Sequence, residues 1–507
     1  MSRIANTKRN IVWAYIDYIL VTAFSFILRT AVVKYLGAEY LGLSSLFSSI
    51  LQILNMTELG FSAAIIFNMY NPLAQNDIEA VCALLNFYKR VYLTIAVIIL
   101  SVGIALSPFL PHLIKGTYPN NINLYGLYFL YLVNTVSSYI FFAYKTALLT
   151  ALQRLDISKI AYIITSVIQY IAQIIAVIFF RNYYAFVLCL ILGTIGKNIL
   201  TAWLANYYFP KYQCRGTLSP ATKNDIILRV KGLLVGLISS VTYTTFDSII
   251  LAAFIGLKSV AIYSNYVLIY TGVGSFITII RTAMEASIGN SVAIETKEKN
   301  YNDMLLWQFI FSFIATCCTT CMLLLYQPFM DLWMGKDMLL SEIGVILLCL
   351  WFFFSIIQNS YYLYLATTGS WWDMRWPYMV STIVNLVLNI ILGKIWGIAG
   401  IIFASLFSSV TSGLLWQCNI IFRIYFQRKP TQFYRRLAVY FTICIVSIFL
   451  SSLIISKYVS LFENNILTLI VRAVICTVVS LVIQLLVYSQ LPFTKKELKR
   501  AISFIMR

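Results

Sequence analysis

Charged residues are scarce in this chain, and their scarcity excludes an ordinary water-soluble protein. Of the 507 residues only 11% are charged, whereas 61% are hydrophobic, and the mean hydropathy is +0.84. Soluble domains carry about 25% charged residues, because water must solvate their surface. The composition therefore predicts an all-α, polytopic membrane protein.

Histidine is almost absent, and cysteine is confined to patterns that exclude the usual metal and disulfide sites. His112 is the only histidine in the sequence. Eight of the ten cysteines lie in apolar runs, and Cys82 and Cys214 lie between runs, which is not the spacing of a disulfide framework. The run Cys317-Cys318-Thr319-Thr320-Cys321 has no histidine or paired carboxylate nearby, so it indicates helix packing. We predict no cofactor and no metal.

Acidic residues are outnumbered by basic ones. The chain has 37 Lys and Arg against 18 Asp and Glu, a net charge of +19. Such an excess can indicate a nucleic-acid partner, but here the cations gather in short segments such as Arg423 to Arg436 and Lys495 to Arg500. Membrane topology and anionic headgroups explain that pattern. We therefore expect contact with anionic membrane lipids and none with nucleic acid.

Long apolar runs are abundant. A helix that crosses the hydrocarbon core needs about 20 mostly apolar residues. Fourteen runs meet this need, at 11–33, 41–69, 88–111, 122–148, 159–180, 183–206, 231–256, 261–288, 304–327, 341–367, 377–395, 397–422, 434–456 and 466–488. No signal-peptide cleavage site follows the first run, so we expect the first span to be retained.

The placement of Lys and Arg predicts the orientation of the spans. With a cytoplasmic N-terminus, seven of the 37 cations fall in outer loops, namely Lys34, Lys115, Arg181, Lys258, Lys336, Lys394 and Lys457. Five lie inside spans and away from the cytoplasmic span ends, at Arg29, Lys145, Lys197, Arg281 and Arg472, and the remaining 25 lie in cytoplasmic segments or at the cytoplasmic ends of spans. Both termini are therefore predicted to be cytoplasmic.

Three short matches recur in order along the chain and predict an internal repeat. Gly37 in YLGAEYLGLSS matches Gly256 in FIGLKSVAIYS at an offset of 219 residues. The pair Pro108-Phe109 recurs as Pro328-Phe329 at an offset of 220, and Asp156 and Asp373 are 217 residues apart. Each match occupies the same place relative to the spans.

The repeat predicts two parallel six-helix lobes around a central cavity, followed by two further helices. The predicted boundaries are 1–210 for the N-terminal lobe, 211–230 for a cytoplasmic loop between lobes, 231–422 for the C-terminal lobe, and 423–507 for two extra spans and a basic cytoplasmic tail. Six spans is an even number, so both lobes share one orientation. Transporters built from parallel repeats hold substrate between lobes that rock to give alternating access.

The segment from Arg9 to Ala74, with YLGAEYLGLSSLF and ELGFSAAI, resembles the bacterial polysaccharide flippases. These O-antigen and capsule repeat-unit transporters are related to MATE exporters and lipid II flippases. The resemblance implies a bacterial cytoplasmic-membrane protein, not an enzyme, that moves an undecaprenyl-pyrophosphate-linked oligosaccharide from the inner to the outer leaflet. It also implies contact with proteins of polysaccharide synthesis.

The charged residues inside spans form two predicted layers. Arg29 and Asp247 lie eight and nine residues before the matched glycines, in the outer parts of spans one and seven, where they are candidates for an ion pair that opens and closes the cavity. Glu58, Arg281 and Glu285 lie toward the cytoplasmic side. Because Arg281 and Glu285 are four residues apart, they form either a local ion pair or a site that faces the substrate.

Related flippases place essential cations in the first, second and eighth spans, and Arg29 and Arg281 fit the first and last of these. Span two offers Glu58 and no cation. Lys145 and Lys197 are therefore further candidates to bind the substrate pyrophosphate, although Lys145 is also placed to reach the surface alone. Asp17 is a candidate for a coupling ion or is solvated by the inner mouth.

Two other classes of protein compete with a flippase. A membrane-embedded glycosyltransferase or polymerase needs a catalytic constellation on a sizeable outer loop, and the longest outer segment, about 327–340, is short. A MATE-like drug or cation exporter has the same architecture, and fold does not determine substrate. Such an exporter favours acidic residues in its cavity, whereas Arg29 and Arg281 here balance Asp247 and Glu58.

The polar run SSVTYTTFDS of span seven is predicted to line the cavity.

Overall fold

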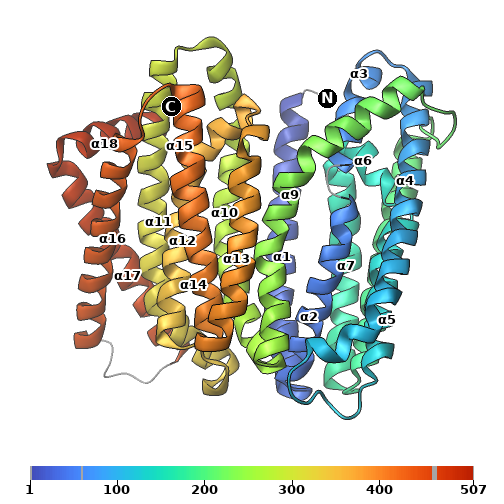
Figure 1. Cartoon of the computed structure of the whole chain (residues 1–507), viewed down its shortest axis with the longest axis horizontal. Coiled ribbons are helices and arrows are strands. Elements are labelled where there is room, and N and C mark those ends of the chain that lie inside the picture. Colours follow the sequence, from blue (N-terminus) through green and yellow to red (C-terminus); the bar gives the residue numbers. More distant parts are fainter. Residues whose placement is uncertain (1–2, 59–60, 459–464, 506–507) are drawn as a thin grey trace. The chain divides into compact units, whose positions relative to one another are not determined.

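The computed structural model describes residues 3–58, 61–458 and 465–505, which form helices joined by turns, with no strand among them. The chain divides into two compact units, Met1–Ala261 and Ile262–Arg507, here called the N-terminal and C-terminal units. Their helices are labelled in Figure 1. The all-helical fold predicted from composition is confirmed.

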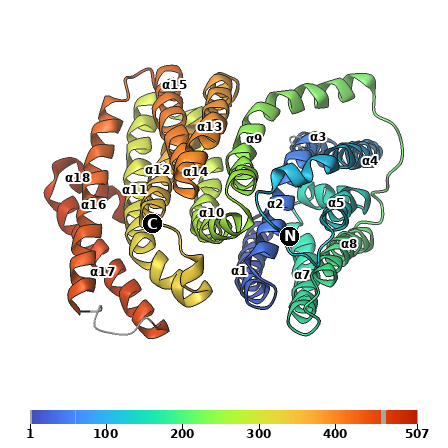
Figure 2. The ribbon, with the colours of Figure 1, turned by 60° about the horizontal axis from the view of Figure 1, so that its bottom comes forward.

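The N-terminal unit is a bundle of long helices. Its elements are α1 (Arg3–Tyr35), α2 (Ala38–Leu54), η1 (Asn55–Glu58), α3 (Phe61–Ala74), α4 (Ile78–Leu106), η2 (Ser107–Leu113), α5 (Leu124–Ile140), α6 (Tyr144–Ala151), α7 (Leu155–Ile178), α8 (Tyr183–Tyr208) and α9 (Pro220–Phe254). Helix α7 packs against both α1 and α8, and α2 packs along α9. The first turns of α9 cross one end of this unit (Figure 2).

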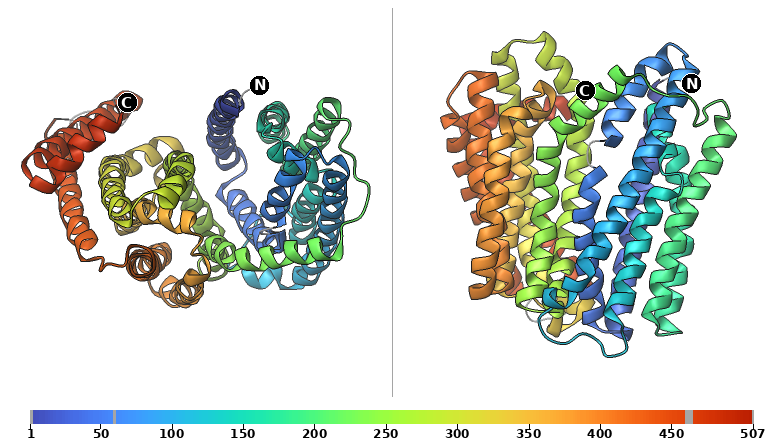
Figure 3. Two further views of the ribbon diagram at one scale, coloured as in Figure 1. Left: turned by 90° about the horizontal axis from the view of Figure 1, so that it is seen from above. Right: turned by 45° about the vertical axis from the view of Figure 1, so that its right-hand side comes forward.

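The C-terminal unit is organised around α11. Its elements are α10 (Leu257–Ile294), in which the boundary falls, α11 (Lys297–Met334), η3 (Lys336–Met338), α12 (Glu342–Thr368), η4 (Trp372–Met374), α13 (Arg375–Trp396), α14 (Ile398–Ser408), η5 (Ser409–Gln417), α15 (Cys418–Ile421), η6 (Phe422–Phe426), α16 (Thr431–Tyr458), α17 (Ile466–Gln490) and α18 (Pro492–Ile505). Helix α11 contacts α12, α16, α17 and α18. The last three helices, drawn in red, lie along one edge of this unit (Figure 3).

Each predicted span coincides with a helix or with successive helices. Eleven helices among the described residues are long and apolar enough to cross a membrane, and the pair α5 and α6, bent by 45°, makes twelve. The predicted span 41–69 is divided into α2, η1 and α3, of which α2 is only 17 residues long. The predicted span 231–256 lies in α9, but the side chains of residues 231–244 lie outside the described part.

The backbone confirms the repeat at matched glycines. Gly37 follows α1 with φ 122°, and Gly256 follows α9 with φ 127°. Each glycine N–H donates to the carbonyl five residues earlier, at 3.0 Å for Gly37 and 2.9 Å for Gly256. Gly116 and Gly335, also 219 residues apart, have φ 87° and 86°. Residues with a Cβ rarely adopt these angles, so the same turns require glycine in both halves.

The division into compact units differs from the predicted lobe boundary by one helix. Residues 211–230 were predicted to separate the lobes, yet α9 packs in the N-terminal unit along α2 and α3. A Cβ on Gly42 would lie 2.2 Å from the backbone oxygen of Leu257, so the glycine lets the two segments approach closely. The Lys115 N–H also donates to the carbonyl of Ala252 at 2.9 Å. The repeat therefore describes chain order, whereas close packing sets the boundary of the unit.

The C-terminal tail, predicted only as a basic segment, forms the helix α18. Arg500 binds Asp303 of α11 at 2.6 Å and Glu497 at 2.9 Å, and Glu497 also binds Arg436 of α16 at 3.3 Å. Leu498 and Ala501 pack on an apolar cluster of α11, α16 and α17. The apolar residues of the tail recur every three to four positions, as in an amphipathic helix, and a count of charges does not reveal this spacing.

Candidate functional site

Three charged side chains meet where α1, α7 and α8 pack together in the N-terminal unit. The ammonium of Lys159 on α7 donates to Asp17 Oδ2 on α1 at 2.5 Å. The Lys197 ammonium on α8 lies 4.3 Å from the centre of the Tyr162 ring, and the Lys159 ammonium lies 5.8 Å from the same ring centre. Lys197 also interacts electrostatically with Lys159 and Asp17. We call Asp17, Lys159, Tyr162 and Lys197 the charged cluster.

The charged cluster has more positive than negative charge. Two lysines face one carboxylate, and the Tyr162 ring stabilises ammonium groups through its π face. Asp17 is 6% exposed, so it is not solvated by an open mouth, and its Oδ1 is buried without a hydrogen bond among the described residues. Asp17 is buried, whereas both lysines are partly exposed. A partly exposed site with more cations than carboxylates is suited to an anionic group.

The start of α1 is held against α7 by a second set of ion pairs. Asp156 is 3% exposed and binds Arg9 and Arg154, each at 3.0 Å. The Arg154 guanidinium lies 5.6 Å from the centre of the Tyr208 ring. These contacts connect α1, α7 and α8, and Asp156 precedes Lys159 of the charged cluster by three residues. They fix the rotation of α1 that turns Asp17 toward Lys159.

Glu58 is held by tyrosines rather than by a cation. Tyr92 donates to Glu58 Oε1 at 2.7 Å and accepts from Tyr88 at 2.6 Å. Tyr139 is shared between Glu58 Oε2 at 3.4 Å and Asn55 at 3.2 Å. This network joins η1 to α4 and α5 at the break in the second predicted span. These hydrogen bonds satisfy the Glu58 carboxylate inside the unit, so the network gives Glu58 a structural role.

Lys145 is buried instead of reaching the surface. It is 4% exposed, and its ammonium donates to the carbonyl of Tyr212 at 3.0 Å. Tyr212 lies in the segment between α8 and α9, so this bond attaches that segment to α6. The structure therefore gives Lys145 a structural contact between α6 and the segment before α9.

Arg281 and Glu285 form the local pair that their spacing predicts. Arg281 Nη1 donates to Glu285 Oε1 at 2.7 Å on α10, and the guanidinium lies 5.0 Å from the centre of the Tyr362 ring on α12. The side chain of Arg281 is 15% exposed and that of Glu285 is 34% exposed. Arg281 therefore has one acidic and one aromatic neighbour within the C-terminal unit.

Arg29 and Asp247 both lie in the N-terminal unit, on α1 and α9. Asp247 is fully buried, as are the neighbouring Thr245 and Ser248, and Arg29 is half-buried. The rest of the polar run of span seven, residues 239–244, lies outside the described side chains. An ion pair between Arg29 and Asp247 remains a prediction.

Many hydroxyl groups of the spans bond to their own helix. Ser25 donates to the Val21 carbonyl at 2.7 Å, and Thr30 donates to the Phe26 carbonyl at 2.8 Å. Ser275 on α10 makes the same contact four residues back, at 2.7 Å. These bonds satisfy the hydroxyls locally, so such residues need no substrate to explain them.

The C-terminal unit carries a basic groove with a volume of about 880 Å³. Four cations line it, Arg375, Arg423, Arg428 and Lys429, together with Asp373, Trp376 and Trp416. Arg428 is also paired with Glu298, and the two tryptophans are 56% and 40% exposed. Exposed tryptophan beside Arg and Lys is typical of the membrane interface. The groove lies on the segment predicted to face the cytoplasm.

Sequence reasoning identified two members of the charged cluster but assigned them separate roles. Asp17 was a candidate for a coupling ion and Lys197 for the substrate. The structure brings them together through Lys159, which sequence analysis had treated only as a cytoplasmic cation. A carboxylate in the inner third of a span needs a partner. That need was the sequence signal that could have prompted a search for a cation such as Lys159 on a neighbouring helix.

Solved membrane transporters share this fold. A structure described as lipid II flippase MurJ in an inward closed conformation aligns with a TM-score of 0.63 and 17% identity, and covers 94% of this chain and 99% of its own. An inward-facing MATE multidrug resistance transporter of the MOP superfamily has a TM-score of 0.62 and 15% identity, and the alignment covers 81% of this chain and 98% of the transporter's chain. An outward-facing MATE structure has a TM-score of 0.55 and 14% identity, and the alignment covers 81% of this chain and 95% of that structure's chain. No protein-family model and no curated protein sequence matches the chain.

These likenesses define the class as a multi-pass membrane protein with a transporter fold. At this level of identity they establish the fold and leave the substrate to be argued from the site. Within that class, the lipid II flippase structure and this chain align over nearly their full lengths.

Proposed function

We propose that the protein is a flippase that moves an undecaprenyl-pyrophosphate-linked oligosaccharide repeat unit from the inner to the outer leaflet of a bacterial cytoplasmic membrane. The observation that carries this proposal is the charged cluster of α1, α7 and α8, with two lysines against one buried carboxylate. A pyrophosphate is a strong anion, and cations inside spans are retained where they bind an anion or line a polar path.

The fold supports a carrier mechanism. Two parallel repeats imply two lobes that rock about the substrate, so that the lipid-linked sugar is released without being cleaved. In this mechanism Lys197 and Lys159 attract the pyrophosphate, and Asp17 limits their charge while no substrate is bound. In the C-terminal unit, Arg281 is a separate candidate to bind a phosphate, by exchanging Glu285 for it.

The test is a host in which the gene is deleted and replaced by variants. Deletion should cause lipid-linked repeat units to accumulate on the cytoplasmic face, and the native gene should clear them. Lys197→Gln should lower flipping by about tenfold, because a charge-assisted contact is worth about 1.5–3 kcal/mol. Lys258→Gln, which removes an exposed lysine predicted to face outward, is the matched control and should flip normally.

Arg281 separates a role in substrate binding from a role in the fold. Arg281→Ala should lower flipping more than it lowers protein abundance, because a phosphate contact acts in transport while an ion pair supports folding. Glu285→Ala removes the same pair but keeps the cation, so it should preserve more flipping. Equal losses of flipping and abundance in both variants would assign the pair to structure alone.

A drug or cation exporter is the second candidate, because the MATE structure aligns with nearly the same TM-score. The excess of cations in the charged cluster favours an anionic substrate instead. If deletion leaves lipid-linked sugars unchanged and increases sensitivity to cationic dyes, the exporter is correct. A membrane-embedded glycosyltransferase or polymerase would instead change the length or composition of the lipid-linked glycan.

A further inference from the structure

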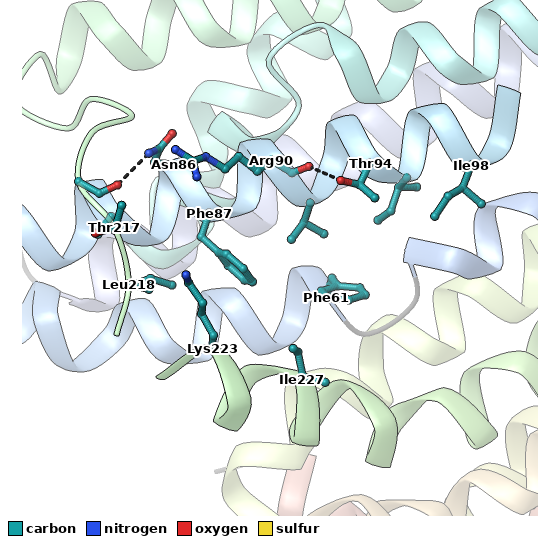
Figure 4. A pocket seen from close by; sticks show the side chains of 14 residues that line it. Phe61, Asn86, Phe87, Arg90, Thr94, Ile98, Thr217, Leu218, Lys223 and Ile227 are labelled. Atoms are coloured by element: carbon teal, nitrogen blue, oxygen red, sulfur yellow. Dashed lines mark hydrogen bonds between the residues drawn. The ribbon is translucent and has the colours of Figure 1, made fainter. Parts of the chain in front are cut away.

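A second site lies in the N-terminal unit, apart from the charged cluster in its lining. It is a cavity of about 470 Å³ between α3, α4, the segment before α9 and the first turns of α9 (Figure 4). Its volume falls within the range of about 300–1,000 Å³ that is usual for small-ligand sites. None of the residues assigned to the proposed transport site lines it.

One end of this cavity is cationic and forms hydrogen bonds. Arg90 on α4 extends toward Asn86, and the Lys223 ammonium on α9 points to the same end of the cavity, on the side of Leu218 (Figure 4). Asn86 donates to the carbonyl of Gly216 at 2.8 Å, which attaches the segment before α9 to α4. Within the described part of the chain, neither Arg90 nor Lys223 forms an ion pair.

The other end is apolar and continues onto an exposed hydrocarbon surface. Phe61, Ile98 and Ile227 line it, and the last two are 42% and 41% exposed. Next to Ile98 on α4, Val97 is 63% exposed and does not line the cavity. In a membrane-spanning helix such exposed aliphatic side chains contact lipid. A lipid therefore has lateral access to the cavity.

We infer that this cavity binds an anionic membrane phospholipid, with the phosphate between Arg90 and Lys223 and the first part of an acyl chain along Phe61, Ile98 and Ile227. Arg90 lies at the start of the predicted span 88–111, within α4, and Lys223 lies in the first turn of α9. Both positions are predicted to face the cytoplasm, where anionic headgroups are found. Polar groups are limited to one end, so the site suits a small headgroup rather than an oligosaccharide. The bound lipid joins α4 to α9, because each helix supplies one cation.

The experiment measures lipid binding to the purified full-length protein by native mass spectrometry. The probes are phosphatidylglycerol and phosphatidylcholine with the same acyl chains. Phosphatidylglycerol should bind more tightly, and Arg90→Gln or Lys223→Gln should each weaken it about fivefold, as expected for about 1 kcal/mol per cation. Lys89→Gln is the matched control, because this exposed lysine neighbours Arg90 but does not line the cavity.

The apolar end has its own matched pair. Ile98→Trp fills the cavity and should weaken phosphatidylglycerol binding, whereas Val97→Trp adds the same group to the outer surface and should not. Equal binding of both lipids, or an equal loss in Lys89→Gln, would overturn the inference. Tighter binding of a polyprenyl phosphate than of phosphatidylglycerol would also overturn it and would identify a substrate site. The assay does not measure flipping, so its outcome is separate from that of the proposed function.

Discussion

Breaking the ion pair between Lys159 and Asp17 in the charged cluster should destabilise the protein. Lys159→Gln removes the charge that compensates Asp17, whose side chain is 8% exposed and whose Oδ1 has no other hydrogen bond among the described residues. Breaking a buried pair costs about 3–5 kcal/mol, whereas an exposed pair is worth about 0.2–1 kcal/mol. Because the Lys159 side chain is 36% exposed, we expect a loss of about 1–3 kcal/mol.

A double-mutant cycle isolates this interaction. Asp17→Asn, Lys159→Gln and the double variant are purified, and their thermal midpoints are compared with that of the native protein. The double variant should be more stable than Lys159→Gln alone, because it no longer contains an uncompensated carboxylate. A change of 1 kcal/mol corresponds to about 2–4 °C for units of this size, so the rescue should be measurable.

The same cycle separates stability from transport. Although the double variant should recover its midpoint, it should still flip lipid-linked sugar less well than the native protein, because it lacks one of the two lysines that we propose to bind the pyrophosphate. Lys159→Arg keeps the charge and should retain both properties. If the midpoint shifts of the single variants add to that of the double variant within about 0.5 kcal/mol, the two residues are not coupled and the charged cluster has been misinterpreted.

Two further predictions concern the packing of the N-terminal unit and the predicted ion pair between Arg29 and Asp247. Gly42→Ala should destabilise the protein by about 1–3 kcal/mol, because its Cβ would lie 2.2 Å from the Leu257 oxygen; Gly274→Ala, which meets nothing within 4 Å, should not lower the thermal midpoint. Arg29→Asp and Asp247→Arg should each impair transport or expression, while the double swap recovers stability better than activity. Purely additive effects of the two swaps would show that Arg29 and Asp247 do not form a pair.

The span pattern and the repeat could be predicted because each depends on local physics. Apolar runs of the length of the membrane mark the helices, so even the divided span of α2 and α3 was located. Gly37 and Gly256 stand out in sequence because a turn with φ near 120° excludes side chains, and both adopt that turn. The acid at Asp17 was noticed for the same reason, since a carboxylate in a span is locally expensive.

The partners of the charged residues were decided by tertiary packing. Helical periodicity places Arg281 and Glu285 on one face, and that local pair forms. It does not tell which helix faces Asp17, so Lys159 was missed. It also does not tell that Lys145 finds the Tyr212 carbonyl instead of the surface. Such contacts depend on how each helix is rotated and on which helices pack against it. The sequence of a single helix determines neither.

By itself, the sequence determined the helical class, the order of the spans and the matched glycine turns, because hydrophobic length and backbone sterics act within a few residues. Only the tertiary structure decided that α9 packs with α2, that two lysines share the Tyr162 ring, and that Arg90 and Lys223 meet at one cavity. These groups lie far apart in the chain, and their approach depends on many small packing contacts at once, such as that of Gly42 with Leu257.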